Sequence, residues 1–392
     1  MERKITSNKI LSITIALVCL YFLLADYSVY YIKYTNAIAV VIGILVLIVS
    51  NATRRIFDKR RMILSRVFFG AWLLVFLIST IINVCPVHLA LYLQVIFGTL
   101  FVAVNDDLRK SVFVDFVRLY CIFLVLSFVE YALYFVGANF SLGTVYRGDN
   151  PSPFINSLFN LIRVSTPRFQ CLAEEPGVIG TINGFLFHIL QSKEYRKQKY
   201  IVLLTGIFTF SIAFYVLCFI SIISSNRRLI VKVIPLFAVV GILMLFPSLT
   251  EQFIVDRVVE ERIDNRTHVQ FQEMFDRANS NGELLLGKGY QAYYKELKEW
   301  DGSAGAKVFI YQYGWFGVIV IFLCYLFIYV RGTPISRYSL VFFLIFWLSF
   351  YQRQFIYQPF YLLIFFSFGL LGIKQPFLKN NYKIKKLSKQ YG

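Results

Sequence analysis

The residues best suited to chemistry in this 392-residue chain are arginines and glutamates in two polar segments, 139–175 and 249–305. The second segment contains four charged residues at helical spacing: Arg262, Arg266, Glu273 and Arg277. If 260–278 is helical, as its apolar spacing allows, these side chains fall within about 60° of one another around the helix axis. The spacing therefore predicts a charged stripe rich in arginine.

An arginine stripe suits phosphate, because the planar guanidinium donates paired hydrogen bonds and stays charged at every relevant pH. His268, Phe271 and Phe275 would occupy the opposite face of this helix. We therefore expect the helix to lie on a membrane surface with its apolar side down. The alternative is a solvated face in which Asp264 and Asp276 pair with the arginines.

The first polar segment ends in the run R-F-Q-C-L-A-E-E-P-G at 168–177, which leads into an apolar stretch. Glu174 and Glu175 precede a proline, where the dipole of a following helix favours negative charge, and this structural role is sufficient to explain both. The functional alternative makes one carboxylate a base or an orienting partner for a sugar hydroxyl. Arg163 and Arg168 would share an anion with the stripe or contact lipid headgroups instead.

Apolar elements must position these residues. The chain is 58% hydrophobic and 16% charged, whereas a soluble domain carries about 25% charged residues, so a soluble enzyme is excluded. Apolar runs occur at 10–25, 36–50, 66–84, 87–104, 112–138, 176–191, 200–224, 229–248, 306–330, 337–351 and 356–373. They predict an all-α, polytopic integral membrane protein with about 10–12 transmembrane helices, as one integral membrane domain over 1–392.

The net charge of +18 is mainly an orientation signal. Most Lys and Arg residues fall in short segments beside the apolar runs: 1–9, 51–66, 109–110, 193–199, 227–232, 331–337 and the tail after 373. The positive-inside rule places these segments and both termini in the cytoplasm. The segments 139–175 and 249–305 then become two long extracytoplasmic loops, and we predict no nucleic-acid partner.

The run 200–224 has basic segments on both sides, and one straight span cannot place both of its ends inside. We therefore predict a short helical hairpin that bends near 209–211, buried in protein or lining a cavity. The alternative is a single span, which would move 249–305 to the cytoplasm.

Metal and cofactor chemistry has no supporting pattern. There is no CxxC pair, the three histidines are far apart in sequence, and no nucleotide-binding fingerprint occurs, so we predict neither a metal nor a cofactor. Glu130 lies deep in an apolar run and is a functional candidate by default. Without a repeated acidic partner, it is weak support for a proton-coupled transporter.

Four motifs follow one another along the chain: the R-to-E-P-G run at 168–177, N-R-T-H-V-Q-F at 265–271, L-L-L-G-K-G-Y at 284–290 and Y-Q-Y-G-W-F-G at 311–317. In this order, together with the hairpin at 200–224, they resemble the Wzy family of O-antigen and capsular polysaccharide polymerases, which is related to the O-antigen ligases. The motifs cover about 170–320, and the hydropathy extends the likeness to most of the chain. The resemblance implies a GT-C-like helical architecture.

The resemblance also implies a metal-independent membrane glycosyltransferase of the cytoplasmic (inner) membrane, acting in lipopolysaccharide or capsule biosynthesis. It would transfer the growing glycan from undecaprenyl pyrophosphate to the non-reducing end of a new lipid-linked repeat unit at the periplasmic face. The implied partners are the undecaprenyl-pyrophosphate-linked oligosaccharide, the lipid bilayer, a chain-length regulator and a flippase.

In that reaction, arginines would stabilise the charge that builds on the pyrophosphate leaving group. The candidates are Arg168, Arg266 and Arg277, supported by Arg163 and Arg262. Glu175 is the first candidate for orienting or deprotonating the acceptor hydroxyl, and Glu174 is the second. Tyr290 would stack on a sugar face, although anchoring at the membrane interface explains a tyrosine there equally well.

Two other functions compete with the polymerase. An O-antigen ligase would transfer the glycan to lipid A core, but that family carries a histidine where 301–307 reads D-G-S-A-G-A-K. A lipid-linked oligosaccharide flippase or other transporter would favour symmetric repeats and charges distributed through the spans. Here the charge outside the basic segments is concentrated in two loops.

Overall fold

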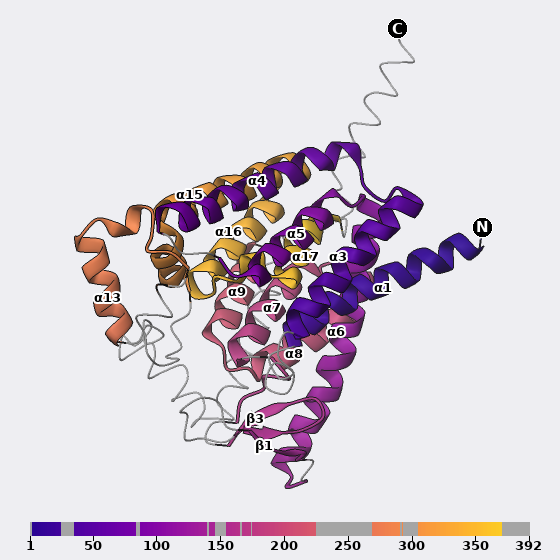
Figure 1. The fold of residues 1–392 in the computed structure, drawn as a ribbon. Coiled ribbons are helices and arrows are strands. Elements are labelled where there is room, and N and C mark those ends of the chain that lie inside the picture. Colours follow the sequence, from indigo (N-terminus) through magenta and orange to yellow (C-terminus); the bar gives the residue numbers. More distant parts are fainter. Residues whose placement is uncertain are drawn as a thin grey trace, which may run out of the picture.

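Helices make up nearly all of the regular structure that the computed structural model describes (Figure 1). The described residues are 2–24, 35–83, 87–138, 141–145, 154–164, 167–173, 175–224, 269–290, 292 and 305–370. Twelve α-helices lie among them: α1 (Glu2–Leu24), α3 (Thr35–Arg54), α4 (Lys59–Ile82), α5 (Leu89–Ala103), α6 (Asp106–Phe135), α7 (Pro176–Ile189), α8 (Arg196–Ile207), α9 (Ile212–Ser224), α13 (Val269–Ser280), α15 (Ala306–Gly332), α16 (Arg337–Gln352) and α17 (Pro359–Ser367). The all-α prediction is confirmed at this level.

Four helices of the described chain are long and apolar enough to cross a membrane, namely α3, α4, α6 and α15. An α-helix rises about 1.5 Å per residue, so about 20 residues are needed to cross the hydrocarbon core. Shorter apolar helices, among them α5, α7 and α9, pack beside them. These candidate spans indicate a multi-pass membrane protein. The apolar run at 229–248 lies outside the described residues.

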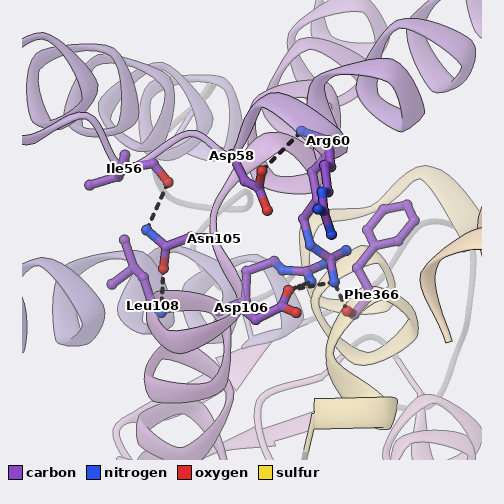
Figure 2. Close-up of polar contacts among 9 residues, drawn as sticks. Ile56, Asp58, Arg60, Asn105, Asp106, Leu108 and Phe366 are labelled. Atoms are coloured by element: carbon purple, nitrogen blue, oxygen red, sulfur yellow. Dashed lines mark hydrogen bonds and ion pairs between the residues drawn. The ribbon is translucent and has the colours of Figure 1, made fainter. Parts of the chain in front are cut away.

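One end of the bundle is held together by a polar cluster around the start of α6 (Figure 2). Asn105 caps α6 by accepting a hydrogen bond from the Leu108 amide at 3.0 Å, and it donates from Nδ2 to the Ile56 carbonyl at 2.9 Å. Phe57 and Val104 form an antiparallel β-bridge beside it. The chain leading into α4 is thus fixed against the chain leading into α6.

Arg109 completes this cluster from the first turns of α6. Its side chain is 1% exposed, pairs with Asp106, and donates from Nη1 to the Phe366 carbonyl of α17 at 3.0 Å. Asp106 also pairs with Arg61 of α4. The starts of α4 and α6 and the end of α17 therefore lie together, at what we call the Arg109 end of the bundle.

Helices α7 and α16 run antiparallel, and their contacts define the opposite end. At one end of the pair, His188 of α7 stacks on Tyr338 near the start of α16, with 4.4 Å between ring centroids. At the other end, Glu175 precedes α7 and Arg353 follows α16, and their side chains pair. Helix α7 also runs antiparallel to α6, since Tyr120 bonds Asn183 at 2.8 Å and Ser127 contacts Cys171. This second end of the α7–α16 pair therefore lies away from Arg109. We call it the Arg353 end.

The predicted hairpin is present as α8, a turn at 208–211, and α9. Both of its open ends lie beside the end of α7, since Lys199 donates to Gln191 at 2.8 Å and Ser221 contacts His188 at 3.0 Å. Its turn lies one helical turn into α7, where a Cβ added at Gly180 would meet the Ser211 side chain at 2.6 Å. The hairpin prediction is confirmed, and the single span is excluded.

A small antiparallel sheet, which the sequence did not predict, lies in the first polar segment next to the end of α6 (Figure 1). Its strands are β1 (Gly143–Val145), β2 (Phe154–Asn156) and β3 (Leu161–Arg163), in that order. Glu130 of α6 accepts hydrogen bonds from the Leu158 and Phe159 amides, both at 3.0 Å, and from Asn160 Nδ2 at 3.1 Å. These bonds assign Glu130 a structural role in holding the β2–β3 turn.

Helix α13 corresponds to the predicted helix over 260–278, of which 260–268 lies outside the described residues. Its apolar face packs on protein, where the expectation was a membrane surface. Phe271 is fully buried and meets Tyr311 of α15 edge to face at 5.5 Å between centroids. Ala278 and Leu284 belong to the same small core. The second polar segment is thereby attached to the start of α15.

Candidate functional site

The centre of the candidate site is the ion pair between Glu175 and Arg353 at the Arg353 end. Arg353 donates from Nη2 to Glu175 Oε2 at 2.6 Å. The guanidinium is 1% exposed, whereas the Glu175 side chain is 44% exposed. The pair therefore presents an accessible carboxylate that is held from behind by a buried cation.

The local sequence explains why the Glu175 carboxylate points away from its own helix. Pro176 occupies the first turn of α7, and Glu175 takes the N-cap position with an extended backbone, φ −149° and ψ 153°. Its side chain makes no capping hydrogen bond. The sequence predicted that the helix dipole stabilises Glu175 at this position, and the structure adds a hydrogen bond from Arg353.

Sequence reasoning missed Arg353. The residue follows α16 and stands in the short polar connection before α17, where no motif marks it. One signal was available, since Arg353 is a basic residue between two apolar runs and belongs to none of the basic segments that set the orientation. A buried guanidinium is costly unless an acid pairs with it, and this requirement points to a partner such as Glu175.

Further polar atoms are buried around Arg353. The Tyr361 hydroxyl of α17 lies within the electrostatic reach of Arg353, and the Gln352 and Gln354 side chains flank the arginine in sequence. The Tyr361 hydroxyl and both glutamine Oε1 atoms are buried without a hydrogen-bond partner among the described residues. Buried polar atoms are nearly always paired, so these three atoms are exceptions close to Arg353 in the sequence or in the fold.

Arg168 holds the turn of the hairpin. It donates from Nε to the Thr209 carbonyl at 2.8 Å and from Nη2 to the Phe210 carbonyl at 2.9 Å. The Phe169 amide donates to the Phe208 carbonyl at 3.0 Å. Phe210 has φ 47°, in the left-handed region that a phenylalanine rarely adopts. These contacts make Arg168 a positioning residue for the hairpin, whereas the sequence suggested a direct contact with phosphate.

The remaining predicted residues are distributed over several elements. Arg163 ends β3 and pairs in register with Phe154. Arg277 and Glu273 both lie on the exposed face of α13, as the stripe predicts for this part of the helix. Three predicted residues, Glu174, Arg262 and Arg266, lie outside the described residues.

Tyr290 lies in an aromatic group where the second polar segment meets the bundle. Its ring packs edge to face on His88 at 5.1 Å and stacks on Tyr313 at 6.5 Å between centroids. Its backbone amide donates to Ser79 Oγ at 3.4 Å. Tyr290 is therefore partly buried at this junction.

The motifs at 284–290 and 311–317 pack directly on each other, backbone against backbone. The Lys288 amide donates to the Tyr311 carbonyl at 2.8 Å, and the Gly289 amide donates to the Gln312 carbonyl at 3.1 Å. α15 is kinked at Gly314, with φ 73° and ψ 173°. A Cβ on Gly314 would meet the Leu285 carbonyl at 2.4 Å, so the glycine permits both the kink and the approach.

Two titratable groups in the polar segments have shifted pKa values. The hydrogen bond from Lys288, at 2.9 Å, lowers the pKa of the Glu283 carboxyl. Burial raises the pKa of the Cys171 thiol to about 12, so this cysteine is a thiol at neutral pH. Among the described residues, no group of three or more His, Cys, Asp or Glu side chains is arranged to hold a metal ion.

Comparison of the chain with models of protein families, with curated proteins and with solved structures finds no match.

Proposed function

We propose that the protein is a membrane glycosyltransferase of the repeat-unit polymerase type. It transfers a growing glycan from undecaprenyl pyrophosphate to the non-reducing-end hydroxyl of a new lipid-linked repeat unit. The observation that supports this proposal is the accessible Glu175 carboxylate paired with the buried Arg353 at one end of a helical membrane bundle. The order of the motifs between 168 and 317 supports the same function.

In this proposal Glu175 acts on the acceptor sugar. The bond between the anomeric carbon and the pyrophosphate oxygen breaks, and a bond from that carbon to the acceptor oxygen forms. The acceptor proton passes to the Glu175 carboxylate, and the lipid pyrophosphate leaves as an anion. Arg353 holds this carboxylate in place through the hydrogen bond from Nη2 to Oε2.

The arginines of the second polar segment act on the leaving group. Arg266, Arg262 and Arg277 supply charge-assisted hydrogen bonds to the pyrophosphate, each worth about 1.5–3 kcal/mol. Helix α13 packs on α15 through Phe271 and Tyr311, and this contact gives Arg277 a fixed support. Arg168 contributes indirectly, by holding the hairpin turn through its bonds to Thr209 and Phe210.

The proposal places the Arg353 end on the extracytoplasmic face and the Arg109 end, with both termini, in the cytoplasm. A Ser280→Cys variant tests the orientation, because Ser280 is exposed at the end of α13. The described native cysteines are all buried, so Cys85→Ser provides a suitable background. We expect an impermeant maleimide to label intact cells, and labelling only after the membrane is opened would contradict the orientation.

The catalytic proposal is tested with the purified full-length protein and a lipid-linked repeat unit, with glycan length read on a gel. We expect Glu175→Gln to reduce chain extension by about 10²-fold or more, as for loss of a general base. Arg266→Ala and Arg168→Ala should also abolish extension while protein levels stay normal. The matched control is Asp107→Asn, an exposed acid in the first turn of α6 at the Arg109 end.

The outcome separates the competing functions. Full-length glycan from the Glu175→Gln and Arg266→Ala variants would exclude this site. Loss of glycan transfer to lipid A core with normal chain length on the lipid carrier would identify a ligase. A cell that retains lipid-linked repeats on the cytoplasmic face would identify a flippase.

A further inference from the structure

An apolar groove runs along the outside of the bundle between α4 and α15. These two helices lie side by side (Figure 1) and run antiparallel, since Cys324 contacts Val67 and a Cβ on Gly332 would meet Leu64 at 3.7 Å. The groove is shallow and largely open, with a volume of about 660 Å³. Its lining is apolar and includes Val67, Gly70 and Leu74 of α4 and Leu323, Phe327 and Val330 of α15.

Gly70 creates the open space in this groove. A Cβ added there would meet no atom within 4 Å. Both helices that form the groove are candidate membrane spans, so the groove faces the hydrocarbon of a bilayer. Its volume falls within the range of about 300–1,000 Å³ typical of small-molecule sites, which is suited to a flexible hydrocarbon chain.

Two arginines stand at the Arg109 end of the groove. Arg66 lies one turn before Gly70 on α4, and Arg331 lies one turn after Phe327 on α15, so each shares a face with a lining residue. The Arg331 guanidinium lies over the Phe327 ring at 5.8 Å from the centroid. Both arginine side chains are exposed. The groove thus has an apolar lining and an exposed arginine on each of its two helices, one turn from a lining residue. These features suit a ligand in which an acyl chain is joined to a phosphate.

We propose that this groove binds an anionic phospholipid of the leaflet at the Arg109 end. One acyl chain lies between α4 and α15, and the headgroup phosphate binds Arg66 and Arg331. Long basic side chains near the ends of spans reach the level of the headgroups, where each contributes about 1 kcal/mol to the attraction of anionic lipid.

The position of the arginines distinguishes this lipid from the carrier lipid of the proposed reaction. Arg66 and Arg331 belong to α4 and α15, at the Arg109 end. The Glu175–Arg353 pair lies at the other end. The proposal therefore does not depend on the glycosyltransferase function, and it stands if that function is excluded.

The experiment uses the full-length protein, purified in detergent and stripped of lipid. Dioleoyl phosphatidylglycerol and dioleoyl phosphatidylcholine are added separately, and bound lipid is counted by native mass spectrometry. These probes carry the same chains, so a difference between them reports the headgroup. The variants are Gly70→Leu, which places a larger side chain in the groove from a Cβ that meets no atom within 4 Å, and Arg66→Gln with Arg331→Gln, which removes the cations. Arg337→Gln is the matched control, because it removes an exposed arginine at the start of α16.

We expect the native protein to retain phosphatidylglycerol over phosphatidylcholine. Each arginine replacement should reduce that preference about fivefold, Gly70→Leu should reduce retention of both lipids, and Arg337→Gln should change neither. Equal retention of the two lipids by the native protein would overturn the proposal. Unchanged lipid retention in both groups of variants would also overturn the proposal. A dimer that Gly70→Leu dissociates would overturn it as well, since it would show that a second copy of the chain fills the groove.

Discussion

Arg353 and Glu175 are 178 positions apart in the chain, and they meet through a hydrogen bond of 2.6 Å from Nη2 to Oε2. The arginine follows α16, and the glutamate precedes α7. The contact joins the ends of two antiparallel helices and places the Glu175 carboxylate against a buried cation. It determines both the stability of this end and the chemistry available there.

Replacing Glu175 with Ala should destabilise the protein, because it leaves the Arg353 charge buried without this carboxylate. Loss of one partner of a buried pair costs about 3–5 kcal/mol, and the partial exposure of Glu175 reduces the expected cost to about 1–3 kcal/mol. Thermal unfolding in detergent measures it. The double variant Glu175→Ala with Arg353→Met should recover part of the loss. If the double variant is less stable than Glu175→Ala, the loss of stability does not come from the unpaired charge of Arg353.

Replacing Arg168 with Gln should loosen the hairpin turn without unfolding the bundle. The variant loses the hydrogen bonds to the Thr209 and Phe210 carbonyls, each worth about 1.5–3 kcal/mol for a charged donor. Hydrogen–deuterium exchange across 208–211 should rise. Arg196→Gln is the control, since Arg196 is exposed at the other end of the hairpin and contacts Tyr200. Equal exchange in the two variants would contradict the positioning role of Arg168.

Replacing Gly314 with Ala should be far more damaging than the same change at Gly282. Gly282 has φ 73° and ψ 7°, a left-handed conformation that costs a non-glycine residue about 1 kcal/mol. Gly314 has φ 73° and ψ 173°, a region essentially restricted to glycine. A Cβ on Gly314 also meets the Leu285 carbonyl at 2.4 Å, whereas a Cβ on Gly282 meets no atom within 4 Å. The difference in melting temperature measures the backbone strain at Gly314 together with the contact between the two motifs. Similar melting temperatures would show that this contact contributes little.

Replacing Glu130 with Gln should destabilise the β2–β3 turn. The carboxylate accepts two backbone amides and one side-chain amide, and a glutamine would present its own NH₂ group to one of these donors. We expect a cost of about 1–3 kcal/mol in unfolding free energy. Asp107→Asn, an exposed acid in the first turn of α6, is the control. A stable Glu130→Gln protein that lacks activity would instead assign Glu130 to the chemistry.

The sequence by itself determined the helical architecture, the candidate membrane spans and the helical hairpin. These features follow from local rules, since apolar runs of sufficient length form spans and basic segments orient them. The bend near 209–211 followed from the basic segments on both sides of one apolar run, and it appears as the turn between α8 and α9. The exposed side of α13, with Glu273 and Arg277, followed in the same way from helical periodicity.

Only the tertiary structure decided which of the candidate residues meet. It paired Glu175 with Arg353, assigned Arg168 to the hairpin turn, and used Glu130 to hold the β2–β3 turn. Each of these contacts depends on how distant helices pack, and hydropathy specifies that a helix is buried but not which neighbour it meets. Contacts across 178 positions are therefore set by the three-dimensional packing of the bundle, where a buried charge must find its partner.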